Sequence, residues 1–341
     1  MRKPTFREVI LTVLLGGACF WLWRLQHPSF EMIEFYSAHP SWCEKPHDVV
    51  LPPTEPAAKA NDDTIRVLFI GNSHTYVNDV PQIVSQLAEA GGLSMHVETH
   101  AFGGYSLPQH WNDKSAATRI ATGDWDFVVL QGQSACSAMC SAEMSKAVGL
   151  LDEVVRSVGA ETVLYMVWVR DDIESNQDPW TASYMLAAEE HHVRVAPAGY
   201  VWQQLEERDF DYRMRSYDGN HATPVGSFVS ALTLAATLLG KSPSSLLESL
   251  EQRFPGAIRD HGFDGGSLKL LETTSDDALE SFAKLSPADI GRTSRKGLDF
   301  LGAVFYQHKM YREAQERWER HGKVVGDSEA VKAALRQIEH D

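Results

Sequence analysis

Three polar residues in this sequence have the types and the spacing that acyl transfer requires. Ser73 follows a short apolar run, in the segment Gly71-Asn72-Ser73. Far downstream, Asp218 and His221 stand three residues apart, and no other histidine of the chain has an aspartate three positions before it. A serine hydroxyl is a weak nucleophile that needs an adjacent base, usually a histidine oriented by a carboxylate. The pattern predicts Ser73 as nucleophile, His221 as base and Asp218 as the residue that orients it.

Glycines and glutamines supply hydrogen-bond donors for the negative charge that such a reaction develops. A tetrahedral oxyanion is stabilised by donors that are fixed in advance. The backbone N–H groups of Ser73 and Gly104 are the first two expected donors, since Gly103 and Gly104 let the main chain approach a ligand closely. The side-chain amide of Gln131 or Gln133 is the expected third. The sequence does not distinguish between these two glutamines.

Aromatic and imidazole side chains stand close to these segments. His74, Tyr105 and Trp111 are expected to line a substrate pocket, because binding sites are commonly lined by aromatic side chains, which also suit the faces of sugars. Packing in the core or at the rim is the alternative for each of them. Ser73 also has a simpler alternative, because serine and asparagine are preferred at the start of a helix.

Apolar runs alternate with segments of helical spacing between these residues. The expected strands cover 64–70, 95–99, 127–130, 162–169 and 193–196, and the expected helices cover 81–90, 108–121, 140–157, 180–190 and 223–239. Such alternation predicts an α/β fold, in which a parallel sheet lies between helices. Ligands bind outside the carboxyl ends of such strands, and the polar segments named above fall at those ends.

The order of these segments resembles the SGNH (GDSL-like) hydrolase superfamily over residues 64–243. Gly71-Asn72-Ser73 stands where the family carries its nucleophile, Gly104 stands for its oxyanion glycine, and Asp218 and His221 stand for its last block. The resemblance implies a flavodoxin-like three-layer α/β/α sandwich. The family's third block is usually Gly-x-Asn-Asp, whereas this chain has Gln131-Gly132-Gln133-Ser134, which is closer to the carbohydrate acetylesterase branch.

The N-terminus has the composition of a membrane segment. Residues 9–23 carry no charge, and basic residues flank them on both sides. Such a run can span a bilayer, and the basic N-terminal flank predicts that the rest of the chain lies outside the cytoplasm. A cleaved signal peptide and a buried core helix are the alternatives. We therefore expect an N-terminal membrane anchor helix or signal at 1–25, a linker at 26–63, and a periplasmic or extracellular catalytic domain.

Residues 244–341 are expected to form a helical C-terminal region that carries no chemical signature. Within it, residues 295–322 have small and apolar residues at the positions of one tetratricopeptide-like repeat. A single repeat cannot bury its own face. It is expected either to pack on the sheet domain or to offer a groove to a protein partner.

Composition excludes several classes of function. The 341 residues are 43 % hydrophobic, which suits a packed globular core, and the formal net charge of −15 argues against a nucleic-acid partner. The four cysteines form no C-x-x-C pair, and zinc-protease and nucleotide-binding motifs do not occur, so no metal and no cofactor is expected. Cys136 and Cys140 are expected to be small buried residues, and a disulfide involving Cys43 is the alternative if the domain is exported; the sequence does not determine which cysteines would pair.

The sequence therefore predicts a membrane-anchored serine esterase that acts on small acyl esters through an acyl-enzyme. O-acetyl groups, on glycans among other alcohols, are the expected substrates. A non-catalytic module of the same fold that binds a glycan or a protein is the first alternative. An acyltransferase that uses the same three residues is the second.

Overall fold

The computed structural model describes residues 43–51, 57–58, 60–171, 173, 176–290 and 304. The expected membrane segment at 1–25 lies outside this part of the chain, and so does the tetratricopeptide-like hairpin at 295–322 except for residue 304. Within the described residues, each helix by itself is too short or too polar to cross a membrane. Pro224–Leu239 and Pro243–Arg253 have sufficient length and hydropathy only as a pair, which is bent by 106°.

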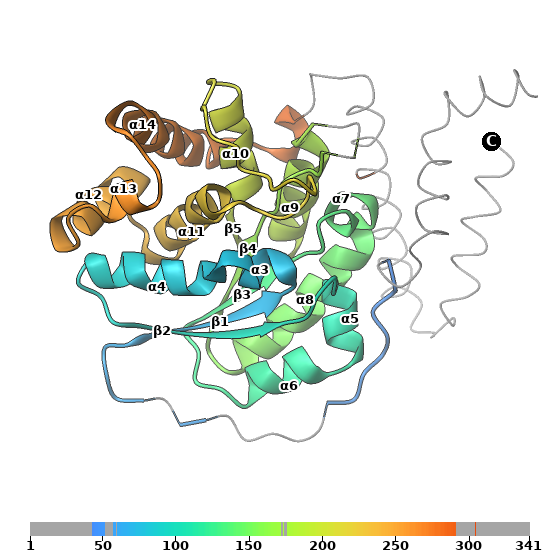
Figure 1. Ribbon diagram of the computed structural model, residues 1–341. Coiled ribbons are helices and arrows are strands. Elements are labelled where there is room, and N and C mark those ends of the chain that lie inside the picture. Colours follow the sequence, from blue (N-terminus) through green and yellow to red (C-terminus); the bar gives the residue numbers. More distant parts are fainter. Residues whose placement is uncertain are drawn as a thin grey trace, which may run out of the picture.

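A five-stranded sheet forms the centre of the described structure (Figure 1). Its strands are β1 (Ile65–Gly71), β2 (Met95–Ala101), β3 (Phe127–Gln131), β4 (Glu161–Tyr165) and β5 (Arg194–Ala196). All four neighbouring pairs are parallel, in the order β2-β1-β3-β4-β5, so the predicted five-stranded parallel sheet is confirmed. The order reverses at β1, and such a switch point leaves a crevice at the carboxyl ends of the strands.

Helices cover both faces of the sheet (Figure 1). One face carries α4 (Val80–Ala90), α10 (Ala198–Glu206), α11 (Pro224–Leu239), α12 (Pro243–Arg253) and α14 (Gly265–Phe282). The other carries α5 (Leu107–Asn112), α6 (Ser115–Ala121), α8 (Ser141–Ser157) and α9 (Asp178–His191). Shorter helical turns are α3 (Ser73–Tyr76), η1 (Val77–Asp79), α7 (Cys136–Met139), α13 (Ala257–Asp260) and η2 (Pro287–Asp289).

The inner strands β1, β3 and β4 are mainly apolar because helices bury both of their faces, whereas the edge strand β2 is partly exposed and carries polar residues. In β1, Val67 and Phe69 pack on the side of α4 and α11, whereas Leu68 and Ile70 pack on the side of α8, and all four are fully buried. This two-sided burial makes β1 the rigid element that carries the residues following it.

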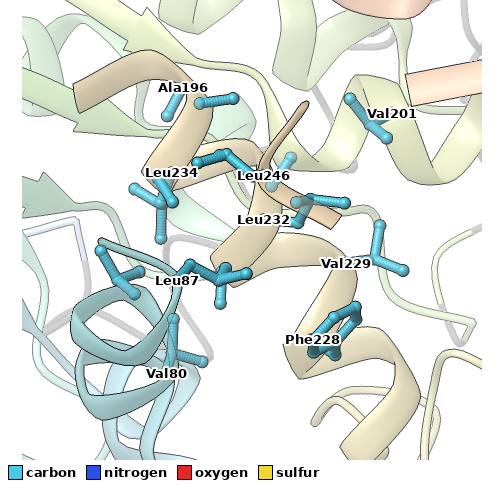
Figure 2. Close-up of a cluster of buried hydrophobic side chains, with 14 of the residues drawn as sticks. Val80, Leu87, Ala196, Val201, Phe228, Val229, Leu232, Leu234 and Leu246 are labelled. Atoms are coloured by element: carbon cyan, nitrogen blue, oxygen red, sulfur yellow. The ribbon is translucent and has the colours of Figure 1, made fainter. Parts of the chain in front are cut away.

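Helix α11 is apolar on nearly all sides because other elements enclose it. Figure 2 shows its Phe228, Val229 and Leu232 in one cluster with Val80 and Leu87 of α4. The same cluster includes residues of α12 and α14, so the core continues past residue 243, where the sequence suggested that the sheet domain ends.

Two elements differ from the predicted ones. The fourth strand ends at Tyr165 and not at residue 169. Beyond it, the side chain of Gln177 accepts from the Val169 N–H at 2.8 Å and donates to the Val167 carbonyl at 2.9 Å, so a side chain replaces the neighbouring strand. The expected helix at 108–121 is two helices, α5 and α6, because Lys114 adopts a left-handed conformation between them (φ 65°).

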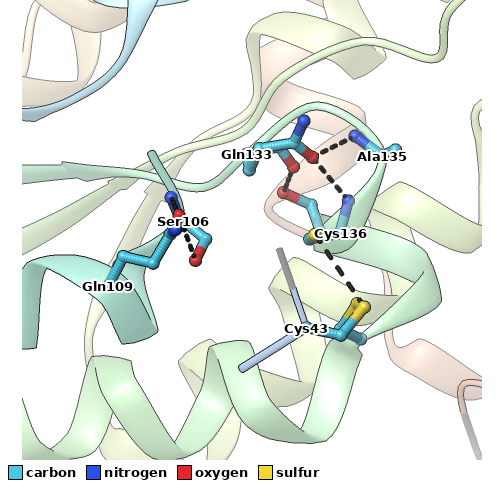
Figure 3. The surroundings of a disulfide bond; sticks show 8 residues. Cys43, Ser106, Gln109, Gln133, Ala135 and Cys136 are labelled. Carbon is cyan, nitrogen blue, oxygen red and sulfur yellow. Dashed lines mark hydrogen bonds between the residues drawn. A yellow bond between two sulfur atoms is a disulfide. The ribbon is translucent and has the colours of Figure 1, made fainter. Parts of the chain in front are cut away.

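A disulfide joins the segment before the sheet to the start of α8. Cys43 pairs with Cys140, 97 positions away, and the free thiol of buried Cys136 lies 4.0 Å from the Cys43 sulfur (Figure 3). Nearby, the indole N–H of Trp111 donates to the His47 carbonyl at 2.8 Å. The segment that begins at Cys43 is therefore held against the α8 side of the domain.

Candidate active site

Ser73 lies at the carboxyl end of β1, where the strand passes directly into α3. Asn72 caps that helix, and its side chain accepts from the backbone N–H of His74 at 3.0 Å. Gly71 has to be a glycine here, because a Cβ at this position would collide with the side chains of Thr75 and Gln131. The short, capped turn leaves Ser73 partly exposed above the buried strand.

Asp218 and His221 lie in a tight turn immediately before α11. Arg215 and Ala222 form an antiparallel bridge across this turn, and the Ser216 N–H donates to the His221 carbonyl at 2.7 Å. Gly219 permits the turn because its backbone is left-handed (φ 67°). The turn fixes both functional side chains on one side of the helix start.

The structure brings the three predicted residues into one hydrogen-bonded chain. His221 Nε2 lies 2.8 Å from Ser73 Oγ, and His221 Nδ1 lies 2.6 Å from Asp218 Oδ2. A carboxylate can only accept, so Nδ1 carries the imidazole proton of the neutral ring and Nε2 is left to accept from the serine hydroxyl. This is the tautomer in which His221 can remove the proton of Ser73.

The Asp218 carboxylate is held in its charged form. Its partial burial favours the neutral acid. The hydrogen bonds that it accepts from His221, Ser216 and the backbone N–H groups of Asn220 and His221 outweigh this effect and hold the pKa of Asp218 well below its usual range. The Ser216 hydroxyl is 2.6 Å away, and the two N–H groups are 2.9 and 3.0 Å away. Asp218 is therefore a fixed negative charge beside the imidazole.

Two backbone donors, on Ser73 and on a loop joined to the end of β1, leave their hydrogen-bonding capacity unused. Among the described residues, the N–H groups of Ser73 and Gly104 have no hydrogen-bond partner. The loop that carries Gly104 is tied to the end of β1 on both sides. The Phe102 N–H donates to the Gly71 carbonyl at 3.2 Å, and the Asn72 amide donates to the Tyr105 carbonyl at 2.8 Å.

The two glutamines have different surroundings. Gln131 is buried, its Oε1 accepts from the Asn72 N–H at 2.8 Å and from the Thr75 hydroxyl at 3.0 Å, and its amide nitrogen donates to the Gly132 carbonyl. It therefore supports the serine turn, and its amide nitrogen already makes one hydrogen bond to the main chain. Gln133 Oε1 accepts from the N–H groups of Ala135 and Cys136, both at 2.8 Å (Figure 3), and its Nε2 has no partner in the described structure.

The three residues expected to line a pocket lie in different surroundings. His74 is buried beneath the base, with its ring 5.4 Å from that of His221 and 5.0 Å from that of Trp168. Burial lowers the pKa of His74 to about 3, and the neighbouring His221 adds to this effect, so His74 is neutral. Tyr105 is half-buried beside Phe102. Trp111 packs in the core on the α8 side, which was its alternative placement, and its indole N–H binds the His47 carbonyl.

Several supporting residues had no signal in the sequence. The side chain of Asn78 donates to the Ala222 carbonyl at 3.0 Å and to Ser227 Oγ at 2.9 Å, so it ties the segment after Ser73 to the start of α11. The indole N–H of Trp168 donates to the Asn220 carbonyl at 2.8 Å. His110 Nε2 donates to the Gly71 carbonyl at 2.7 Å, and burial lowers the pKa of His110 to about 4. Isolated polar residues of this kind match no motif.

Three exposed aromatic rings lie in the chain segments that carry the site residues. Tyr76, Phe102 and Tyr217 are 45 %, 42 % and 94 % exposed, and they belong to the segments that carry Ser73, Gly104 and Asp218 respectively. A surface hollow lined by Ile65, Phe127 and Glu161 lies at the amino ends of the strands, on the opposite edge of the sheet, and takes no part in this site. The exposed rings are large apolar surfaces that a substrate can contact.

The described residues contain one cluster with metal-ligating side chains. It consists of Cys43, Cys136 and Cys140. Two of these sulfurs are joined in the disulfide and the third is a buried thiol, so three thiolates are not available together. Burial also raises the pKa of the Cys136 thiol well above its usual value, with nearby Glu143 adding to the shift, and this opposes the thiolate form that a metal would need.

Comparison with known proteins identifies solved structures of similar fold. No family model and no curated protein matches the sequence. A DUF4886 family protein from Bacteroides uniformis superposes with a TM-score of 0.53 at 20 % identity, over 67 % of this chain and 100 % of that chain. A candidate SGNH hydrolase from Slackia heliotrinireducens is 28 % identical, with a TM-score of 0.45, over 51 % of this chain and 99 % of that chain.

A family 3 carbohydrate esterase from Clostridium thermocellum is 12 % identical, with a TM-score of 0.42, over 52 % of this chain and 96 % of that chain. The likeness to the Bacteroides uniformis protein shows a shared fold. The solved structures similar to this chain include SGNH and GDSL-like hydrolases and this carbohydrate esterase.

Proposed function

We propose that the protein is a serine esterase that cleaves small acyl esters through an acyl-enzyme on Ser73. The observation that carries this proposal is the hydrogen-bonded chain from Ser73 Oγ through His221 to Asp218, at 2.8 and 2.6 Å. Nucleophile, base and orienting carboxylate are within hydrogen-bonding reach before any substrate binds, which is the geometry that activates a serine.

In the first half of the reaction, Ser73 Oγ attacks the ester carbonyl carbon while His221 Nε2 takes the hydroxyl proton. The carbonyl oxygen becomes an oxyanion beside the N–H groups of Ser73 and Gly104. The intermediate then breaks its bond to the alcohol oxygen, which receives the proton from His221 and leaves. Asp218 stabilises the imidazolium that exists between these two proton transfers.

In the second half, water attacks the acyl carbon of the ester on Ser73. His221 Nε2 takes a proton from that water and returns it to Ser73 Oγ as the acyl–enzyme bond breaks. The products are the carboxylic acid and the free enzyme. An acyltransferase would follow the same steps with a sugar hydroxyl in place of water, so product analysis with an acceptor sugar present distinguishes the two activities.

Gln133 is our candidate for the third oxyanion donor. Its Oε1 is held by two N–H groups at the start of α7, which leaves the Nε2 group to face away from them. We prefer Gln133 to Gln131 because Gln131 Oε1 accepts from the Asn72 N–H and its Nε2 already donates to the Gly132 carbonyl. A fixed side-chain donor of this kind costs no reorganisation when the oxyanion forms.

The proposed substrate is a small acyl group, acetyl above all, on a carbohydrate hydroxyl. Support comes from the exposed rings of Tyr76, Phe102 and Tyr217 in the chain segments that carry the site residues. Flat rings present apolar faces on which the C–H face of a sugar can lie while its acyl group reaches Ser73.

We further propose that the domain works outside the cytoplasm, held by the N-terminal segment at residues 9–23. Support comes from the disulfide between Cys43 and Cys140, since disulfides persist in oxidising compartments and are rare in the cytosol. Protease accessibility of the domain in intact cells tests this part of the proposal.

The activity is tested on the full chain in mild detergent. We expect release of p-nitrophenol from p-nitrophenyl acetate and of acetate from acetylated xylan, and we expect Ser73→Ala to abolish both. Labelling by a fluorophosphonate probe that requires both Ser73 and His221 would exclude a non-catalytic binding module. Undiminished acetate release by Ser73→Ala would refute the proposed function.

A further inference from the structure

We infer that Asn72 is the positioning residue that sets the two backbone oxyanion donors relative to each other. This inference rests on the proposed function, because the donors matter only if Ser73 reacts. Asn72 touches no reacting atom. It links the turn that carries the Ser73 N–H to the separate loop that carries the Gly104 N–H.

The link consists of one side-chain amide. Asn72 Nδ2 donates to the Tyr105 carbonyl at 2.8 Å, while Asn72 Oδ1 accepts from the His74 N–H at 3.0 Å. The His74 N–H can only donate, so the oxygen of the amide must face it and the nitrogen must face Tyr105. The orientation of the amide is therefore determined by its partners on both sides.

The position of the amide is as closely determined as its orientation. Asn72 is only 2 % exposed, and its own backbone N–H donates to Gln131 Oε1 at 2.8 Å. Buried amides keep their hydrogen bonds because an unsatisfied group costs free energy. Asn72 therefore stays fixed to β3 and α3 while it holds the loop at Tyr105.

Within the loop itself, the Tyr105 N–H donates to the Phe102 carbonyl at 3.1 Å, which closes the turn around Gly104 but does not fix that turn relative to Ser73. A Cβ placed at Gly104 would meet no atom within 4 Å, and the glycine has a left-handed backbone (φ 74°). The Phe102 N–H to Gly71 carbonyl bond, at 3.2 Å, restrains the loop on one side, and the Asn72 bond restrains it on the other. Without Asn72, the Gly104 N–H is free to turn away from the oxyanion position.

Substitutions at Asn72 can test its hydrogen bond to the Tyr105 carbonyl separately from its role as the cap of α3. Serine is about as good a cap as asparagine. Its hydroxyl is too short to reach the Tyr105 carbonyl, so Asn72→Ser keeps the start of α3 and loses the tie. Asn72→Ala loses both. Asn72→Asp keeps the acceptor oxygen and the size of the side chain but cannot donate. Ser145→Ala is the control, because it removes a buried hydroxyl bonded to Glu190 and His191, far from Ser73.

The experiment measures kcat, KM and the inhibition constant of methylboronic acid for the full chain. The boronate forms a tetrahedral adduct on serine, so its affinity reports the oxyanion donors, whereas KM reports ground-state binding. We expect Asn72→Ser and Asn72→Asp to lower kcat about 10- to 100-fold and to weaken the boronate by a similar factor. We expect KM to change less than about twofold and Ser145→Ala to resemble wild type.

The outcomes separate the two proposals. Full activity in Asn72→Ser, with loss only in Asn72→Ala, would show that Asn72 serves as a helix cap alone and would overturn the inference. If Ser145→Ala lowers kcat and thermal stability as much as the Asn72 variants do, the inference is also overturned. The loss of activity would then follow from general destabilisation. If Asn72→Ser does not fold, the isosteric Asn72→Asp decides. A wild-type protein without esterase activity and without boronate binding overturns the proposed function, and the inference falls with it.

Discussion

His221 Nε2 lies 2.8 Å from Ser73 Oγ, although the two residues are 148 positions apart in the chain. The contact depends on two rigid supports, the end of β1 and the start of α11, both anchored in the same apolar core. Asn78 ties the two supports directly, because its side chain donates to the Ala222 carbonyl next to His221. The short distance is thus built into the fold and does not require a substrate.

Removing the charge of Asp218 is expected to slow catalysis strongly. Asp218→Asn keeps the size of the side chain, but its amide no longer stabilises the imidazolium and no longer selects the tautomer that accepts from Ser73. We expect kcat to fall about 10²- to 10⁴-fold with little change in thermal stability. The exposed Asp211→Asn is the control and should retain wild-type activity. Rates within twofold of wild type for Asp218→Asn would contradict the role of this carboxylate.

Replacing Gln133 is expected to impair catalysis, whereas replacing Gln131 is expected to impair stability. Gln133→Ala removes the proposed donor and should lower kcat about 10- to 100-fold while the protein stays folded. Gln131→Ala leaves the buried Asn72 N–H and Thr75 hydroxyl without an acceptor, so it should lower the free energy of unfolding by about 1–3 kcal/mol or more. Urea denaturation and steady-state kinetics on both variants check this. A stable, catalytically impaired Gln131→Ala would reverse the assignment.

Acid is expected to destabilise the fold through two buried histidines. The pKa values of His74 and His110 are lowered to about 3 and about 4, mainly by burial. Below the ordinary histidine pKa of about 6.5, the unfolded chain binds protons that the folded chain does not. The stability is complete above about pH 6.5 and falls with decreasing pH, by about 1.4 kcal/mol per pH unit for each histidine.

His110→Gln isolates one of these contributions. Its amide nitrogen replaces the Nε2 donor to the Gly71 carbonyl and does not titrate. Urea denaturation between pH 6.5 and 5 should show a slope smaller than that of wild type by about 1.4 kcal/mol per pH unit. An identical slope for His110→Gln and wild type would show that His110 titrates in the folded protein as it does when unfolded.

Loss of the disulfide is expected to affect stability and not catalysis. Cys43→Ala alone would leave Cys136 and Cys140 free to pair with each other. The informative comparison is therefore between a variant with alanine at all three cysteines (43, 136 and 140) and the single variant Cys136→Ala. Closing a loop of this length restricts the unfolded chain, and its loss should cost about 2–4 kcal/mol. We expect kcat to stay within twofold of wild type. Equal unfolding free energies for the two variants would mean that the bond does not form in the folded protein.

The sequence predicts the parallel sheet and the place of Ser73 because both follow from local patterns. Apolar runs reveal buried strands, and parallel strands put their following residues at one edge. The end of β4 is not predictable in this way, because a distant side chain, Gln177, replaces the neighbouring strand there. Proximity in sequence also does not fix which face of α5 meets the core, and Trp111 takes the core position that was its alternative.

The roles of Asn72 and Gln131 also depend on tertiary contacts. The residues next to them in the sequence do not indicate that the Asn72 amide binds the Tyr105 carbonyl or that the Gln131 amide accepts from the Asn72 N–H. Polar residues at strand ends are thus identified as a group by sequence, whereas the separation of reacting groups from supporting ones requires the packed structure.

The bond between Cys43 and Cys140 also determines how the domain bears mechanical load. The loop that it closes contains Ser73, Gly104 and Gln133. A pull on the chain ahead of Cys43, such as a tether in a moving envelope would exert, passes through the sulfur bridge into α8 and bypasses β1. The strand that carries Ser73 is therefore shielded from tension, and the geometry of the site can persist while the chain ahead of Cys43 is pulled.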